Sequence, residues 1–307
     1  MPTPAVPVID LGAQRQTVAT ELAAAAASWG FFQVTGHGIA PGLIERTQAA
    51  AREFFASEPS LKHSVSRTLD NPFGYYDREL TKNLRDRKEI FDFAPLGETP
   101  LPPAMPALRT ALQAFATACH GLALDLLGRL CEGLGQPATS LAAHFTPSHS
   151  SFLRLNHYPT EDLAPGPELP PAGPFGISHH TDAGALTVLL QDQVPGLQVL
   201  HQGVWLDVDP LPGALTINIG DMLQLWSNDR YLAPLHRVRA SADQARFSIA
   251  WFLNPGYDSV IAPLPGLVSD AAPAQYRPLS WREFRSLRAL GDYGDYGEEV
   301  QISDYRL

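Results

Sequence analysis

The chain has 307 residues, of which 45% are hydrophobic and 18% are charged, and its formal net charge is −10. This length suits one large, elaborated domain with a sizeable buried interior. The acidic balance argues against nucleic acid as a partner, because such binding depends on Lys and Arg side chains that neutralise phosphates.

No apolar run approaches the roughly 18 residues that span a bilayer, and the N-terminus lacks the charged and apolar regions of a secretory signal. Cys119 and Cys131 fall in a helical pattern, and two cysteines make no disulfide framework. These features predict a cytoplasmic protein without a membrane partner, and they leave its oligomeric state open.

The N-terminal region, residues 1–100, alternates short strands with helices. Strands are expected at 6–11 and 31–35, on either side of an Ala-rich helix at 16–29. Pro41 opens a further helix, since proline fits the first helical turn.

The middle of the chain carries two different periodicities. Residues 104–134 place leucines at helical spacing, which predicts a long helix that buttresses the core with one apolar stripe. Residues 150–255 alternate short strands with turn residues, as in a double-sheet jelly roll. The sequence therefore predicts a single α+β domain over 1–307, with a double-stranded β-helix (jelly-roll) core supported by N-terminal and central helices.

Two segments lack a regular pattern. Residues 159–176 are dense in Pro and Gly and are expected to form a surface loop, either a lid or a plain crossover. Residues 256–307 form a C-terminal extension. Its last part, 292–307, contains three Tyr and either folds over a site or lies in solvent.

The stretch HHTD at 179–182 supplies a His and an Asp two residues apart, before an alternating apolar run. On a strand, His180 and Asp182 project to the same side, while His179 and Thr181 face the other way, and His179 fits a structural role. His236 opens a second strand far downstream. An H-x-D triplet alone is a weak signal, but two imidazoles and one carboxylate that leave open positions are expected of non-haem Fe(II) oxygenases.

Arg246 and Ser248 alternate on one face of the strand RFSIAWF, ten residues after His236. An Arg side chain binds a carboxylate through two parallel hydrogen bonds, and a Ser hydroxyl adds a third. The pair therefore predicts an anchor for an acidic co-substrate beside the metal.

The order of motifs resembles the isopenicillin N synthase-like family of Fe(II)/2-oxoglutarate-dependent oxygenases. The resemblance covers nearly the whole chain. The segments that carry it are PVIDLG (7–12), WGFFQVTGHGI (29–39), REFFASEPSLK (52–62), GYYDR (74–78), RKEIFDF (87–93), LRLNHYP (153–159), HHTDAGALTVLLQD (179–192), GLQVL (196–200) and PGALTINIGDMLQLWSNDRYLAPLHRV (212–238).

The resemblance implies that His180, Asp182 and His236 bind Fe(II). It implies an enzyme that combines 2-oxoglutarate and O2 to oxidise, above all to hydroxylate, a small-molecule substrate, with succinate and CO2 as the other products.

The resemblance also implies a co-substrate site. Arg246 and Ser248 would hold the distal carboxylate of 2-oxoglutarate, and Asn156 and Tyr158 would touch the same molecule. Strand periodicity independently places Asn156 and Tyr158 on one face, together with Phe152 and Arg154. The other interpretation of Asn156 is that it begins the turn at Pro159.

The substrate pocket is the least determined part of the sequence. The candidates are residues near the metal strands in the family pattern, namely Tyr75, Tyr76, Phe152, Arg154 and Phe252. For Arg154 two interpretations stand: recognition of a substrate carboxylate or phosphate, and structural pairing with an internal carboxylate.

Three classes of function stay open. The first is the 2-oxoglutarate-dependent oxygenase. The second is an oxidase of the same fold, of the isopenicillin N synthase type, in which Arg246 and Ser248 would grip a substrate carboxylate and no 2-oxoglutarate is used. The third is a silent binding protein, against which the intact ligand triplet argues.

Overall fold

The structure is a computed structural model that describes residues 5–68, 70–81, 84–161, 173–291 and 300–307. Two sheets face each other. The larger has eight strands in the order β1-β2-β12-β9-β14-β7-β6-β3, and the smaller has four in the order β11-β10-β13-β8. The strands of the larger sheet are β1 (Val8–Asp10), β2 (Phe31–Thr35), β3 (Gly74–Tyr76), β6 (Glu89–Phe93), β7 (Phe152–Tyr158), β9 (Leu186–Gln191), β12 (Leu215–Ile219) and β14 (Arg246–Leu253). Those of the smaller sheet are β8 (Phe175–His180), β10 (Leu197–His201), β11 (Val204–Asp207) and β13 (His236–Arg239).

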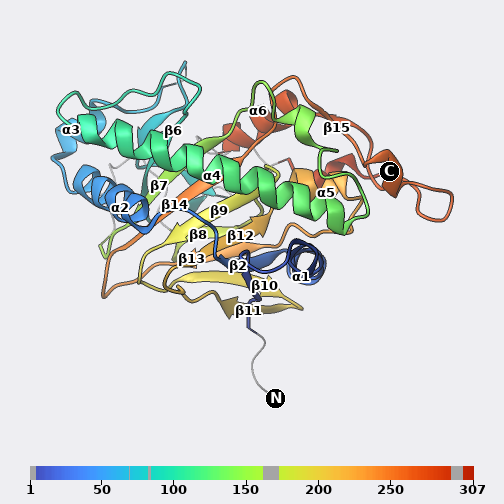
Figure 1. The fold of residues 1–307 in the computed structure, drawn as a ribbon. Helices are drawn as coiled ribbons and strands as arrows, with labels where there is room; N and C mark the ends of the chain where they lie inside the picture. Colours follow the sequence, from blue (N-terminus) through green and yellow to red (C-terminus); the bar gives the residue numbers. More distant parts are fainter. Residues whose placement is uncertain (1–4, 69, 82–83, 162–172, 292–299) are drawn as a thin grey trace.

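Helices cover the outer face of the larger sheet. The long helix α4 (Pro106–Gly133) runs across the sheet, with α2 (Pro41–Phe55) near one of its ends and α1 (Arg15–Ser28) near the other (Figure 1). By length and composition alone, α4 is the one helix among the described residues that could cross a bilayer. Its apolar stripe is instead buried in the main core, as expected of a buttressing helix.

The remaining elements are short, apart from one C-terminal helix. They are α3 (Pro59–His63), β4 (Leu80–Thr81), β5 (Leu84–Arg85), η1 (Ala142–His144), α5 (Asp221–Trp226), β15 (Val260–Ile261), η2 (Pro265–Leu267), β16 (Leu279–Ser280), α6 (Trp281–Gly291) and η3 (Ile302–Tyr305).

The alternation along β7 and β14 separates two interiors. Leu153, Leu155 and Trp251 point into the main core between the larger sheet and the helices. The intervening side chains point to the space between the sheets, where a second apolar cluster includes Tyr158 and Val238. The predicted α+β class with a double-stranded β-helix core is confirmed, and the space between its sheets is where the site lies.

Two expectations need adjustment. Strand β8 begins at Phe175, so the predicted loop at 159–176 ends earlier, and its residues 162–172 lie outside the described part of the chain. Residues 292–299 of the tail are also outside it. Within the described end of the tail, Tyr305 packs edge-on against Phe284 of α6 at 6.0 Å, so this part of the tail rests on the protein.

Candidate metal centre and co-substrate cavity

Three side chains from different segments converge between the two sheets. His180 ends β8, His236 begins β13 directly opposite it in the strand register, and Asp182 lies in the bend after β8. Their ligand atoms all lie within 4.8 Å of one another. Oδ1 of Asp182 lies 3.6 Å from Nε2 of His180 and 3.5 Å from Nε2 of His236. One ion between these atoms would have two nitrogen ligands and one oxygen ligand, the set typical of non-haem Fe(II).

Backbone carbonyls orient both imidazoles. Nδ1 of His180 donates to the carbonyl of Ser178 at 2.8 Å, and Nδ1 of His236 donates to the carbonyl of Pro234 at 3.1 Å. The proton is thereby held on Nδ1, which leaves the Nε2 lone pair facing the metal position.

The carboxylate of Asp182 is held in a similar way. Its Oδ2 accepts hydrogen bonds from the hydroxyl of Thr187 on β9 and from Nδ2 of Asn218 on β12, the latter at 2.8 Å. Thr187 and Asn218 are themselves paired across the β9–β12 ladder. With Oδ2 occupied, Oδ1 is the oxygen that faces the two imidazoles, so the geometry fits a monodentate ligand.

Burial and the mutual charges set the protonation of the three groups. Burial lowers the pKa of His180 to about 3, and the neighbouring His236 adds to the effect. Burial alone would raise the pKa of Asp182, but His236 and His180 outweigh it and hold that pKa well below its usual range. For His236 burial is outweighed by the Asp182 carboxylate, which raises its pKa. Metal ligands must be deprotonated, so a cation that binds here displaces any proton held by His236.

The turn that follows Asp182 is fixed by close backbone packing. The amide of Asp221 donates to the carbonyl of Asp182, and the amide of Gly220 donates to the carbonyl of Ala185. A Cβ at Gly220 would lie 2.2 Å from the carbonyl oxygen of Gly184, so only glycine allows this approach. The bend also turns Thr181 into the cavity wall, although strand alternation predicted that it faces away.

A second group of polar side chains lies in the same cavity, on β7 and β14. Arg246 is paired in register with Tyr158, and Ser248 with Asn156. Nη2 of Arg246 donates to Oε1 of Gln191 at 2.9 Å, whereas its Nε and Nη1 are buried and have no hydrogen-bond partner among the described residues. Oδ1 of Asn156 is buried and unpaired in the same sense. Buried donors without partners are costly, so the two N–H groups of Arg246 fit a bound anion with acceptor oxygens, whereas Oδ1 of Asn156 is an acceptor and calls for a donor.

A cavity of about 170 Å³ joins the two groups. All four residues of the predicted inward face of β7 line it, from Phe152 to Tyr158, and so do Arg246, Ser248 and Phe252. Apolar side chains make up much of the rest, namely Phe31, Leu80, Ile177, Leu189, Leu197 and Val238. The metal position and the paired β7 and β14 side chains therefore share one space with room for a small molecule.

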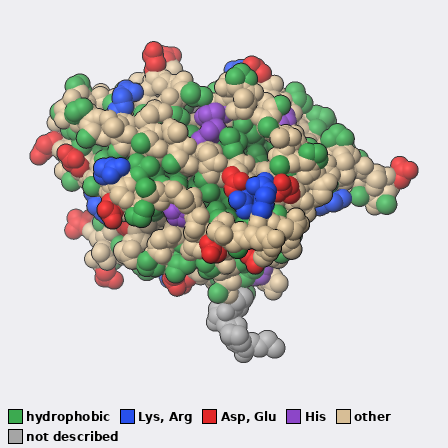
Figure 2. All heavy atoms as spheres, in the orientation of Figure 1, with side chains coloured by type: hydrophobic (Ala, Val, Ile, Leu, Met, Phe, Trp, Pro, Cys, Tyr) green, Lys and Arg blue, Asp and Glu red, His purple; other side chains and the backbone are tan. Residues whose placement is uncertain are grey.

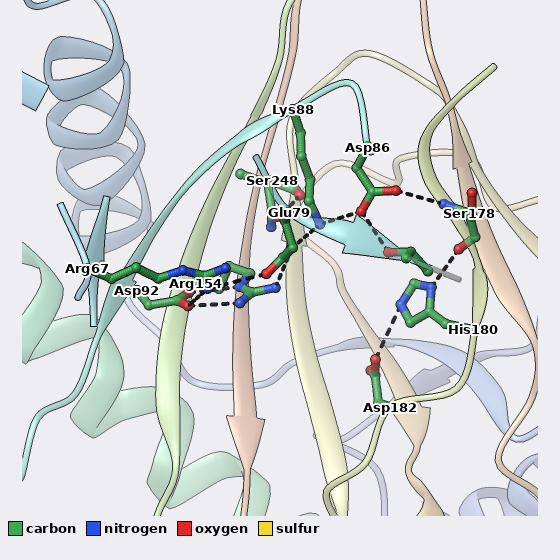
Figure 3. Close-up of polar contacts among 12 residues, drawn as sticks. Arg67, Glu79, Asp86, Lys88, Asp92, Arg154, Ser178, His180, Asp182 and Ser248 are labelled. Atoms are coloured by element: carbon green, nitrogen blue, oxygen red, sulfur yellow. Dashed lines mark hydrogen bonds and ion pairs between the residues drawn. The ribbon is translucent and has the colours of Figure 1, made fainter. Parts of the chain in front are cut away.

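Arg154 belongs to a set of buried charges that we call the buried ion cluster (Figure 3). It consists of three cations and three acids, namely Arg67, Lys88, Arg154, Glu79, Asp86 and Asp92. Arg154 bonds Asp92 at 2.7 and 2.8 Å and Glu79 at 3.0 Å. Lys88 lies 2.6 Å from Glu79 and 3.2 Å from Asp86. The contacts of Arg154 thus follow the second interpretation, internal pairing.

Tyr75 and Tyr76 lie elsewhere. Neither is among the described residues that line the cavity. The hydroxyl of Tyr75 donates to Glu89 at 2.6 Å, and the guanidinium of Arg67 lies 3.7 Å from the ring centre of Tyr76. Both side chains support the packing around β6, because strand β3 pairs with β6 at the edge of the larger sheet.

The cavity wall also contains residues that sequence reasoning did not single out. Thr187 and Asn218 are brought together by the register of β9 and β12, which a sequence does not reveal. Arg285 and Arg288 come from α6, and Nη2 of Arg288 donates to the carbonyl of Thr181 at 2.9 Å. The sequence indicated only that these two residues, spaced i, i+3, lie on the same face of one helix.

Comparisons with known proteins agree with this geometry. Residues 149–255 match the 2OG-Fe(II) oxygenase superfamily, and residues 6–112 match the non-haem dioxygenase in morphine synthesis N-terminal family. The chain is 35% identical to 1-aminocyclopropane-1-carboxylate oxidase homolog 10 of Arabidopsis thaliana, over 91% of this chain and 78% of that protein. It is 31% identical to a flavonol synthase/flavanone 3-hydroxylase of Matthiola incana, over 91% of this chain and 96% of that protein.

Among solved structures, the fold is similar to that of JOX2 in complex with 2-oxoglutarate, iron and JA. The TM-score is 0.84 at 30% identity, over all of this chain and 90% of that one. The chain belongs to the 2OG-Fe(II) oxygenase superfamily. It is an oxygenase that uses Fe(II), 2-oxoglutarate and O2 to oxidise a small molecule, and the oxidase that works without 2-oxoglutarate is not favoured.

Proposed function

We propose that the chain hydroxylates a small organic substrate in the cavity between the two sheets, with 2-oxoglutarate bound to Arg246, Ser248, Asn156 and Tyr158. The observation that carries this assignment is the state of Arg246. Two of its buried N–H groups lack partners, and they face the same cavity as the His180, Asp182 and His236 ligand atoms. A dicarboxylate has one end that can bind the metal and a second carboxylate that can pair with a guanidinium.

Each residue has a separable task. Bound Fe(II) supplies the oxygen-activating chemistry that converts a substrate C–H, 2-oxoglutarate and O2 into C–OH, succinate and CO2. Asp182 and the two imidazoles are the groups that would hold the metal, and as three ligands they would leave it positions for other ligands. Arg246 and Ser248 fix the co-substrate, and the apolar wall excludes water from the reacting groups.

The surface agrees with a small-molecule substrate in place of a nucleic acid. The net charge is −10, and on the face drawn in Figure 2 the Lys and Arg side chains lie scattered among acidic and apolar groups. Nucleic-acid binding would call for a continuous basic surface. Cys119 and Cys131 are free and buried, which supports the expected reducing, cytoplasmic setting.

The test is the fate of 2-oxoglutarate labelled at its first carbon. With Fe(II) and O2 present, we expect labelled CO2 and an equal amount of succinate, also at the slower rate expected without substrate. An Arg246→Gln variant should need at least about tenfold more 2-oxoglutarate, because a bidentate charged contact is lost. No labelled CO2 from the wild-type protein, or unchanged co-substrate dependence in the variant, would rule out the assignment.

A further inference from the structure

Arg285 is a cation of the cavity wall that the proposed co-substrate and metal sites do not use. It lies on α6, lines the cavity, and is partly buried. Its guanidinium carbon lies 5.9 Å from the ring centre of Phe152, and it has no ion pair or hydrogen bond within the described part of the chain.

The helix that carries Arg285 is held beside the cavity by the hydrogen bonds of Arg288. One turn further on, Arg288 donates to the carbonyl of Thr181, beside the metal ligands, and to the carbonyl of Val300 and the side chain of Gln301. Phe152, which Arg285 approaches, lies on β7 in the opposite sheet. Because α6 is held at these points, Arg285 is presented to the cavity by a rigid element.

The other cations of the cavity wall bond groups of the protein or face the co-substrate site, and among them Arg288 donates to two carbonyls and to Gln301. In the buried ion cluster, three acids balance Arg67, Lys88 and Arg154. Arg246 faces the proposed 2-oxoglutarate site. A partly desolvated guanidinium without an anion is unfavourable, so Arg285 is poised for an anionic group that is brought in from solution.

The surroundings of Arg285 define the rest of the ligand. Phe152 and Phe252 occupy paired positions on β7 and β14, with ring centres 4.9 Å apart, and they form an aromatic wall beside the guanidinium. Leu80 and Ala250 extend this apolar surface. Such a wall accepts a flat or aliphatic carbon skeleton and offers little to a sugar or a peptide.

We infer that the substrate is a small carboxylic acid with an apolar or aromatic body, whose carboxylate pairs with Arg285 while its body lies against Phe152 and Phe252. A planar guanidinium matches a carboxylate through two parallel hydrogen bonds. This inference rests on the proposed function and narrows its substrate class.

The test compares acids with neutral partners of the same shape. Phenylacetate, hydrocinnamate and phenylbutyrate, each beside its primary amide, are titrated by calorimetry into protein that holds Zn(II) in place of Fe(II), with saturating 2-oxoglutarate. Zn(II) has no redox chemistry, so the measurement reports binding without turnover. The variants are Arg285→Gln and, as a matched control on the same helix, Arg282→Gln. Arg282 pairs with Asp258 on the surface, and its side chain is 60% exposed.

We expect at least one acid to bind the wild-type protein about tenfold more tightly than its amide, which corresponds to about 1.4 kcal/mol. Arg285→Gln should remove this preference, and Arg282→Gln should keep it. Equal binding of acids and amides, a preference that survives in Arg285→Gln, or no binding by any of the three acids would overturn the inference. Binding of 2-oxoglutarate is measured first on the same samples. If it is absent, the proposed function fails as well, whereas normal 2-oxoglutarate binding confines a failure to the substrate class.

Discussion

The hydroxyl of Thr187 donates a hydrogen bond to Oδ2 of Asp182, the carboxylate oxygen that faces away from the two imidazoles. Together with Asn218, it fixes the orientation of a metal ligand from a neighbouring strand. Groups that orient metal ligands in this way are worth about 10- to 100-fold in metal affinity.

We therefore expect Thr187→Val, which keeps the shape and removes the hydroxyl, to weaken Fe(II) binding by about tenfold or more. Thr187→Ser keeps the donor and should retain most of the affinity. Anaerobic Fe(II) titration of the two variants measures the effect. Equal affinities for Thr187→Val and the wild-type protein would show that the hydroxyl does not hold the carboxylate.

The ligands themselves give a larger effect. His180→Ala, Asp182→Ala and His236→Ala should each abolish Fe(II) binding and turnover, since these three are the side chains in the described part of the chain that are placed to hold the ion. His179→Ala is the matched control, because His179 precedes His180 but is exposed and lies near Trp205, with ring centres 6.4 Å apart. It should bind Fe(II) like the wild-type protein in the same titration, and a loss there would contradict the ligand assignment.

Local patterns in the sequence predicted much of this site. The period of two along β7 places Phe152, Arg154 and Asn156 on the inward face, and all three line the cavity. The same rule was wrong for Thr181, because β8 ends at His180 and the chain then bends. The period of two predicts side-chain orientation only within the strand.

Contacts between distant segments were beyond the sequence. The partners of Arg154, Asp92 and Glu79, lie 62 and 75 residues away, and they meet it only because β6 pairs with β7 and the chain after β3 folds over the cavity. The contact between α6 and the cavity could not be predicted for the same reason. Helical spacing in a sequence does not show which part of the protein a helix packs against.

The pairing in the buried ion cluster predicts a strong effect on stability. Burial alone would raise the pKa of Glu79, but the positive charges of Arg154, Lys88 and Arg67 outweigh burial. The pKa therefore lies well below its usual value, and the carboxylate is ionised. Glu79→Gln leaves buried cations without this acid and should lower the free energy of unfolding by about 3–5 kcal/mol. Urea denaturation measures it.

The control for that experiment is Asp258→Asn, which breaks an exposed ion pair with Arg282 and should cost less than about 1 kcal/mol. Similar small losses in both variants would mean that the buried ion cluster does not contribute to stability as its contacts indicate.

His149 predicts a dependence of stability on pH. Burial lowers its pKa from 6.5 to about 4, and the stacked ring of His120 adds to this. Because the folded state favours the neutral ring, its contribution to stability is complete above about pH 6.5 and is lost as the pH falls towards 4. His149→Asn keeps an acceptor for the amide of Ser151 and does not titrate, so the Tm of metal-free protein should fall less steeply on the acid side.

His63→Asn is the control for that measurement, because it removes a histidine whose side chain is half exposed, so the two variants compare the loss of a buried ring with the loss of an exposed one. If His149→Asn and the wild-type protein lose Tm in parallel, burial of the His149 ring does not cause the acid loss.

Replacement of Arg246 should raise the stability of the ligand-free protein and weaken co-substrate binding. Its Nε and Nη1 are buried without partners, and each such group costs about 1–3 kcal/mol in the ligand-free protein. Arg246→Met has similar length and no polar hydrogens, so it should raise the free energy of unfolding of the ligand-free protein. At a hundred times its Kd, 2-oxoglutarate with Zn(II) should stabilise the wild-type protein by about 2.7 kcal/mol beyond Zn(II) alone. The variant should lose this gain.

Arg237, whose Nε donates to Gln198 at 2.9 Å, provides the control. Arg237→Met removes a guanidinium that has a hydrogen-bond partner, so it should destabilise the protein while keeping its response to 2-oxoglutarate. An Arg246→Met protein that is less stable without ligand, or still stabilised by 2-oxoglutarate, would show that the unpaired N–H groups of Arg246 do not bind the co-substrate.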